Sequence, residues 1–109
     1  MRTIKSSSEI TNIFECGQRI GTPDVNFIVM RNDELHDQSG RVAFIAGKKF
    51  GNAVWRNRAK RRMRGLGVEL GAPFKGYDVV FLARRTINEA SFEIMKRNAV
   101  KALGKHGIL

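Results

Sequence analysis

The chain has 109 residues, of which 42% are hydrophobic, so it is long enough for one domain with an apolar core but too short for two. Its twenty Lys and Arg exceed its ten Asp and Glu, and the net charge of +10 predicts a polyanionic partner. The single cysteine excludes an internal disulfide and, with no second thiol or histidine near it, a zinc finger.

The ends and the apolar runs of the chain bear on its location. The N-terminus has three serines where a signal peptide would have an apolar segment. The longest purely apolar runs, residues 42–46 and 79–83, are far shorter than the roughly 20 residues that span a bilayer. We therefore expect a cytoplasmic protein without a membrane partner, folded as a single domain over residues 1–109.

The first predicted element is a short helix. Ser6 and Glu9 have the spacing of a capping box, and apolar residues follow at helical intervals up to a glycine, which predicts a helix over 7–16. Residues 21–24, with the sequence GTPD, indicate a loop.

Two strands follow this loop. Residues 25–30 and 41–46 are rich in β-branched and apolar side chains, which favours extended structure. The polar residues 32–40 between them are typical of a hairpin connection. Residues 47–50 allow for one short additional strand.

The next segment predicts a strongly amphipathic helix over 53–66, with Asn52 as its N-cap. At 100° per residue, one face is apolar and the opposite face is cationic, with Arg58 and Arg62 on one border. The apolar stripe consists of Trp55, Ala59, Met63 and Leu66. The cationic face consists of Arg56, Asn57, Lys60, Arg61 and Arg64.

The last elements are a strand over 77–83 and a helix that starts at Asn88 and ends near Gly104 or Gly107. The element order is thus α-β-β-(β)-α-β-α. This order predicts an α+β fold in which helices cover a small mixed sheet.

The distribution of charge is the most informative feature of the sequence. No acidic residue lies between Asp37 and Glu69, whereas this stretch contains nine Lys and Arg. A solvated helix face with balanced ion pairs would alternate its charges, so this explanation fails here. Five of the six cations in residues 56–64 are Arg, whose planar fork fits a phosphate group. The segment therefore predicts a nucleic-acid interface.

Catalytic motifs are weak by comparison. The sequence shows no nucleophile paired with a base, and its two histidines lie far apart in polar segments. The acidic residues within 33–37 are better explained as a solvated loop than as a metal site. We accordingly predict no catalytic residue and no protein-bound metal in this chain.

Residues 47–64, GKKFGNAVWRNRAKRRMR, resemble the signature of the bacterial ribonuclease P protein subunit, the RNR motif K-K-x-G-N-A-V-x-R-N-R-x-K-R-x-x-R. The chain carries every fixed position of that motif. The similarity extends to Phe14 and Gly17, to the strand that begins at Arg41, and to Tyr77-Asp78. It departs from the family at Ile10 and Met30, where aromatic residues are frequent.

The resemblance implies a compact α/β sandwich with a left-handed β-α-β crossover around the basic helix. It also implies an RNA-binding surface that contacts ribonuclease P RNA, and a second surface for the 5′ leader of precursor tRNA. Mg²⁺-dependent hydrolysis would then belong to the RNA, with no obligate protein partner. The implied RNA-binding residues are Lys48, Lys49, Asn52, Arg56, Asn57, Arg58, Lys60, Arg61 and Arg64, and the implied leader-binding residues are Ile10, Phe14, Phe27 and Met30.

Two alternatives remain open from the residues alone. The first is a general RNA-binding or ribosome-associated protein of similar fold, which would share the basic helix. The second is a protein whose basic helix contacts acidic lipid or a protein partner, with Trp55 as an apolar anchor.

Overall fold

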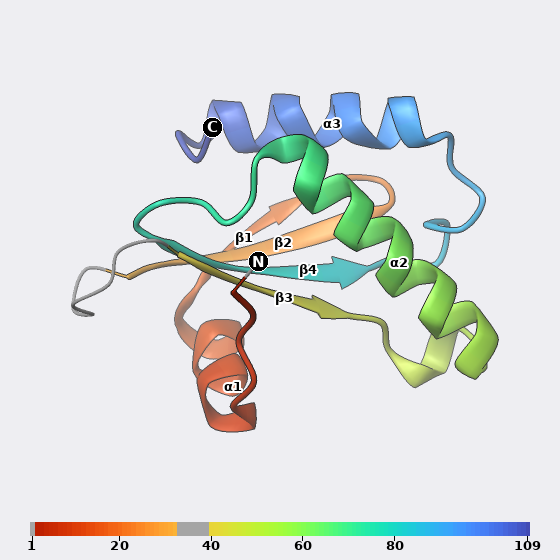
Figure 1. Ribbon diagram of the computed structural model, residues 1–109, viewed down its shortest axis with the longest axis horizontal. Helices are drawn as coiled ribbons and strands as arrows, with labels where there is room; N and C mark the ends of the chain where they lie inside the picture. Colours follow the sequence, from red (N-terminus) through yellow and green to blue (C-terminus); the bar gives the residue numbers. More distant parts are fainter. Residues whose placement is uncertain (1, 33–39) are drawn as a thin grey trace.

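The computed structural model describes residues 2–32 and 40–109, which form one four-stranded sheet with helices on both faces (Figure 1). The predicted α+β class is confirmed, and the boundaries of the first helix and of the last strand match the predictions. In chain order the elements are α1 (Ser7–Cys16), β1 (Gln18–Gly21), β2 (Val25–Arg31), β3 (Arg41–Ile45), a 3₁₀ turn (Lys48–Phe50), α2 (Ala53–Leu70), β4 (Tyr77–Ala83) and α3 (Phe92–Lys105).

The strands lie in the order β1-β2-β4-β3, so β4 lies between β2 and β3. β4 runs antiparallel to β2 and parallel to β3, which makes the sheet mixed and gives a β3-α2-β4 unit of two adjacent parallel strands. β2 and β3 are therefore not paired with each other, and the predicted hairpin between them is wrong. Residues 33–39 themselves lie outside the described residues.

The composition of β4 explains why it takes this inner position. Val79, Val80 and Phe81 are all fully buried, so consecutive side chains on both faces of the strand are shielded from water. Such a strand needs covering elements on both faces of the sheet, and its inner position also gives it a hydrogen-bonded neighbour on each side.

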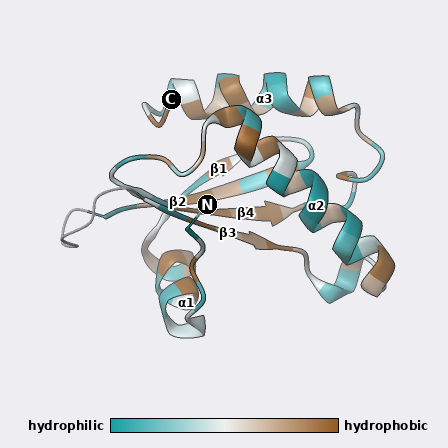
Figure 2. Cartoon of the chain, in the orientation of Figure 1, coloured by the Kyte–Doolittle hydropathy of each residue, from teal (hydrophilic) through white to brown (hydrophobic). Residues whose placement is uncertain are grey.

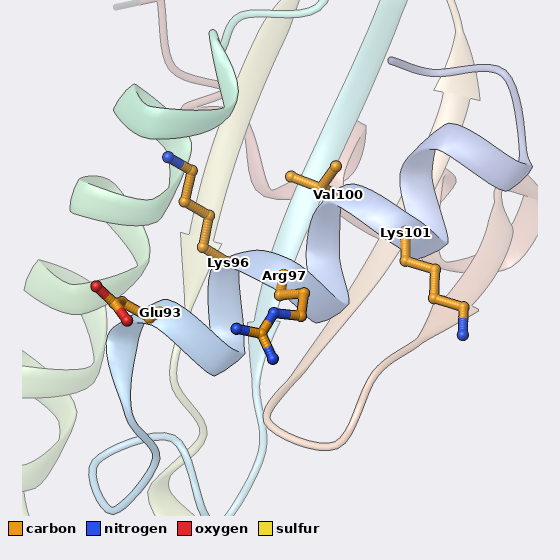
Figure 3. Close-up of a pocket in the computed structure, with 5 residues that line it drawn as sticks. All are labelled: Glu93, Lys96, Arg97, Val100 and Lys101. Carbon is orange, nitrogen blue, oxygen red and sulfur yellow. The ribbon is translucent and has the colours of Figure 1, made fainter.

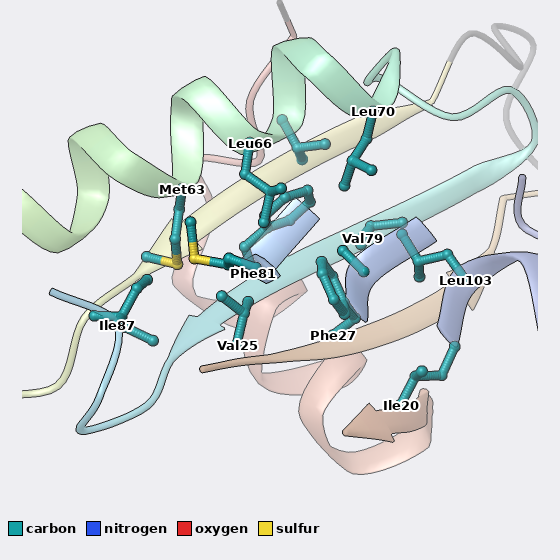
Figure 4. Close-up of a cluster of buried hydrophobic side chains, with 14 of the residues drawn as sticks. Ile20, Val25, Phe27, Met63, Leu66, Leu70, Val79, Phe81, Ile87 and Leu103 are labelled. Carbon is teal, nitrogen blue, oxygen red and sulfur yellow. The ribbon is translucent and has the colours of Figure 1, made fainter. Parts of the chain in front are cut away.

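The two faces of the sheet form two separate cores. α2 and α3 cover one face, where Met63, Leu66 and Leu70 of α2 pack towards Phe81 and the neighbouring strand residues (Figure 4). α1 covers part of the other face, where Ile13 packs with Ile28, Ala43 and Val80. In Figure 2 the strands are mainly apolar, whereas the turns of α2 that follow its apolar first turn are mainly hydrophilic.

The structure corrects the predicted elements at three places: a missed strand, a turn predicted as a strand, and the start of the last helix. Residues 18–21, which the sequence analysis left without a strand, form β1, because pairing with β2 supplies their backbone hydrogen bonds. Residues 48–50 form a 3₁₀ turn and not a strand. The last helix begins at Phe92, with Ser91 as its N-cap, and not at Asn88.

α2 continues four residues beyond its predicted end at Leu66. Gly65 and Gly67 do not end it, because Leu66, Gly67 and Leu70 are buried and their packing continues the helix past both glycines. The helix ends at Gly71, whose φ of 84° places it in the left-handed region that favours glycine.

Candidate nucleic-acid interface

The N-terminus of α2 is built as the sequence predicts. The side-chain oxygen of Asn52 accepts a hydrogen bond of 3.0 Å from the backbone N–H of Trp55. Directly before this cap, Lys48 and Lys49 are exposed on the 3₁₀ turn, and the Nζ atom of Lys49 lies 4.9 Å from the centroid of the Phe50 ring. The two lysines thus extend the cationic surface of α2 past the start of the helix.

The outward face of α2 is cationic and open to solvent. The exposed polar and charged side chains of its first three turns are Asn57, Arg58, Arg61 and Arg64. Lys60 is half-buried beside them. We call these five residues, together with Lys48, Lys49, Asn52 and Arg56, the α2 surface.

Arg56 does not lie opposite the apolar stripe, as the helical wheel predicted. It is half-buried, and its Nε atom is enclosed with no hydrogen-bond partner among the described residues. The buried stripe includes Gly67 and Leu70 as well as Ala59 and Met63. This shifts its centre towards the side of the helix that carries Arg56.

Two arginines at the margins of α2 have contacts within the protein. Arg62 donates a hydrogen bond of 2.5 Å to the backbone oxygen of Ala90, in the segment that precedes α3. The guanidinium carbon of Arg64 lies 5.9 Å from the centroid of the Phe44 ring on β3. These contacts hold the two margins of the helix against neighbouring elements and leave Arg58 and Arg61 facing outwards.

A second candidate surface lies on the opposite face of the sheet, beside α1. Half-buried apolar side chains from four elements pack there against the smaller core that contains Ile13. They are Ile10 and Phe14 of α1, Met30 of β2, Ile45 of β3 and Leu82 of β4. We call these five residues the α1 patch.

Phe27 is not part of the α1 patch, and its predicted place beside Phe14 is wrong. It is 0% exposed and packs on the α2 side of the sheet, with its ring centroid 4.9 Å from that of Phe81. Side chains alternate along a strand, so Met30 and Phe27, three residues apart on β2, point to opposite faces. The prediction overlooked this alternation.

The structure adds three residues that the sequence analysis did not select for this surface. Ile45 and Leu82 are register partners on the parallel strands β3 and β4. The guanidinium carbon of Arg19, on β1, lies 5.6 Å from the centroid of the Phe14 ring. These residues come together only through the pairing of the strands. Their alternation within the apolar runs could still have indicated which face of the sheet they share.

The structure also contains a hollow of about 460 Å³ on α3. Glu93, Lys96, Arg97, Val100 and Lys101 line it, all from this one helix, and their side chains point in diverging directions (Figure 3). Ligand sites usually present polar groups that converge on one point. We therefore assign no ligand to this hollow.

The ribonuclease P family model matches residues 1–107, nearly the whole chain. The chain belongs to the ribonuclease P protein family. The family match decides among the three interpretations left open by the sequence: the chain is a protein component of ribonuclease P, acts in tRNA processing, and has ribonuclease P RNA as its partner.

Individual relatives agree with the family match. The ribonuclease P protein component of Syntrophomonas wolfei is 35% identical over 106 residues, which cover 96% of this chain and 87% of the relative. That of Streptococcus mutans is 33% identical, with 92% of this chain and 82% of the relative covered.

Solved ribonuclease P protein structures share the fold. The Staphylococcus aureus protein, at 21% identity, superposes with a TM-score of 0.80 over 99% of this chain and 97% of that one. The Thermotoga maritima protein, at 20% identity, gives 0.78 over 96% and 97%.

Two further findings concern the described part of the chain. Within residues 2–32 and 40–109, no three His, Cys, Asp or Glu side chains come close enough to hold a metal ion. No helix in these same residues has the length and apolar character needed to span a membrane.

The α2 surface generates a prediction about salt. We expect Arg61→Ala to flatten the salt dependence of binding to ribonuclease P RNA, because each lost phosphate contact lowers the slope of log affinity against log salt by about 0.7–0.9. Arg61 is exposed and contributes nothing to the core, so the melting temperature should not change. Filter binding over a salt series measures the slope.

Lys75→Ala is the matched control for this experiment. It also removes one exposed positive charge, but from the segment beyond the C-terminal end of α2. The slope should stay that of the unchanged protein. An Arg61→Ala slope equal to the control slope would mean that the outward face of α2 does not contact the RNA.

Proposed function

We propose that the α2 surface binds ribonuclease P RNA, that the α1 patch binds the 5′ leader of precursor tRNA, and that the protein thereby assists Mg²⁺-dependent removal of the leader. The observation that carries this proposal is the separation of two surfaces of different chemistry onto opposite faces of one sheet. One surface is cationic and the other is apolar, which suits two different parts of RNA.

The α2 surface has the chemistry that an RNA backbone needs. Arg56, Lys60 and Arg64 are like charges at i,i+4 spacing, and such pairs destabilise an isolated helix by about 0.2–0.5 kcal/mol each. Phosphates next to this ridge relieve the repulsion. The exposed Arg58 and Arg61 add forked donors that can bind a phosphate with two hydrogen bonds.

The α1 patch suits unpaired bases better than phosphates. Phe14 is half-buried and offers part of its ring to a stacked base, while Ile10 and Met30 offer apolar contact. Arg19 lies beside that ring and can neutralise a phosphate of the same strand. A single-stranded leader combines these features, whereas a base-paired stem hides its bases.

We further propose that the catalytic centre lies in the RNA. The described residues do not fit a protein-held Mg²⁺, since no cluster of metal-binding side chains occurs among them. We therefore propose that RNA and substrate phosphates hold the metal, and we assign no step of the hydrolysis to a side chain of this chain. The protein's own contribution is to bind and orient the two RNAs.

The proposal predicts how activity divides between protein and RNA. Purified protein should not cleave precursor tRNA, and cleavage should appear when ribonuclease P RNA and Mg²⁺ are added. Gel analysis of end-labelled precursor tRNA measures this. Correct release of the leader by RNA-free protein, shown to contain no contaminating nuclease, would refute the assignment of catalysis to the RNA.

The leader surface has its own prediction. In the reconstituted holoenzyme, Phe14→Ala should weaken binding of precursor tRNA by about 1–3 kcal/mol, because one stacking platform is lost, and leave binding of mature tRNA unchanged. The free energy of unfolding should fall by clearly less than the about 3–5 kcal/mol expected for a fully buried Phe. Paired binding titrations and a thermal melt measure both quantities.

Ile94→Ala serves as the control for Phe14→Ala. Ile94 is an exposed apolar residue on α3, on the other side of the sheet, so its loss should leave the preference for precursor tRNA intact. If Phe14→Ala lowers the melting temperature strongly and keeps the full preference, Phe14 is a core residue and the leader lies elsewhere.

A further inference from the structure

α1 lies on the face of the sheet opposite α2 and α3 (Figure 1). Within this fully described helix, Ile13 is the one buried side chain. The C-terminal end is fixed by Gly17, whose N–H bonds to the oxygen of Ile13 at 2.7 Å and where a Cβ atom would lie 2.8 Å from the side chain of Ile28. Ile13 and Gly17 hold the C-terminal half of the helix, and the segment before the helix is held at Ile4, which is buried in the same core and whose N–H bonds to the oxygen of Val42 at 2.8 Å.

The N-terminal half of α1 contacts the sheet side through the packing of Ile10 and through an ion pair. The Nη2 atom of Arg41 lies 2.6 Å from a carboxylate oxygen of Glu9, one turn before Ile13. Glu9 and Ile13 are four residues apart and therefore lie on the same face of the helix. The ion pair at Glu9 adds a second contact to that of Ile13 along one face of the helix. Two contacts along one face fix the direction of the helix axis more firmly than one.

The sheet end of this contact is rigid. Arg41 donates hydrogen bonds from Nε and Nη2 to the two carboxylate oxygens of Asp78, at 3.2 and 2.7 Å. Arg41 and Asp78 are also register partners on β3 and β4, and Asn32 donates a further hydrogen bond of 2.9 Å to the same carboxylate. Asp78 is buried, so its position is set by the sheet.

The electrostatics of this group favour the same arrangement. The Arg41 side chain is 16% exposed and lies between two carboxylates, and the hydrogen bonds that it donates to Asp78 and then to Glu9 raise its pKa above the ordinary value for arginine. Arg41 is thus permanently charged. The bidentate pair with Asp78 fixes the guanidinium to the sheet. The same guanidinium also contacts Glu9, whose side chain is 46% exposed.

We propose that the Glu9–Arg41 ion pair acts as a clamp that sets the direction of α1 and thereby the preference of the holoenzyme for precursor over mature tRNA. Ile10 and Phe14 project from the clamped helix, whereas Met30, Ile45 and Leu82 belong to the sheet. The relative position of these two groups depends on the direction of α1. The inference rests on the proposed binding of the leader by the α1 patch, and makes Glu9 and Arg41 positioning residues.

If Glu9 were only a nearby charge and not a clamp, its removal would change RNA binding in the opposite direction. An exposed carboxylate close to bound RNA repels phosphates, so its removal alone would tighten RNA binding. Loss of a clamp would instead lower the preference for precursor tRNA, because Phe14 and Ile10 lose their position over the sheet. The direction of the change therefore separates the two roles.

The experiment uses holoenzyme reconstituted with Glu9→Gln, with Phe14→Ala, and with both substitutions, and compares binding of precursor and mature tRNA. Glu9→Gln should lower the preference for precursor tRNA about threefold to tenfold. The double variant should lose clearly less preference than the two single losses combined, because Glu9 acts through the positions of Phe14 and Ile10. Thermal melts of each variant should show that the domain stays folded.

Glu69→Gln is the matched control, since Glu69 forms an exposed ion pair of 3.8 Å with Lys96 between α2 and α3. It should leave the preference unchanged. Arg41→Lys tests the clamp from the sheet side: it keeps the charge but loses the forked contact, and it should lower the preference as Glu9→Gln does.

The outcomes separate the clamp from the proposed function. A normal or increased preference in Glu9→Gln, with a loss in Phe14→Ala, would overturn the clamp alone. Additive losses in the double variant would also overturn it, because Glu9 would then act independently of Phe14. A full preference in both single variants would instead overturn leader binding by the α1 patch.

Discussion

The burial of β4 on both faces is the constraint on which the rest of the structure depends. Val79 and Phe81 need cover on one side and Val80 on the other, so helices must lie on both faces of the sheet. α2 and α3 supply the cover on one side and α1 on the other. The division of the molecule into a cationic surface and an apolar surface follows from this layering.

The same packing makes the unusual charge of α2 tolerable. A helix with so many like charges and no acid in its first four turns gains little from its own side-chain pairs. Met63, Leu66 and Leu70 hold it on the sheet instead, so tertiary packing stabilises the helix and the cations stay available on the outside. Arg62 and Arg64 contribute to this attachment through Ala90 and Phe44.

Features encoded locally could be predicted from the sequence. The limits of α1, the N-cap at Asn52 and the strand β4 match because caps and apolar runs act over a few residues. The strand β1 was missed because it has only four residues, although it pairs with β2, the next strand in the chain. The side of the sheet that Phe27 faces was misplaced because the alternation along β2 was overlooked.

The candidate site shows the same division. The outward position of Asn57, Arg58, Arg61 and Arg64 was predictable, because a helical wheel needs only local spacing. Their contact with RNA stays a prediction. Arg56 was misplaced although it lies seven residues, and so only about 20° of helix rotation, from Met63 of the buried stripe. Ile45, Leu82 and Arg19 joined the α1 patch or its margin only through the order of the strands.

Directed cleavage from two tethers tests most directly the claim that opposite faces of the sheet contact different RNAs. Cys16, an exposed thiol at the end of α1, can carry a radical-generating chelate, and Arg61→Cys in a Cys16→Ser background can carry the same group on α2. In the holoenzyme with precursor tRNA, the α1 tether should cut the 5′ leader and the α2 tether should cut ribonuclease P RNA. Cleavage of the same RNA segment from both tethers would contradict the account.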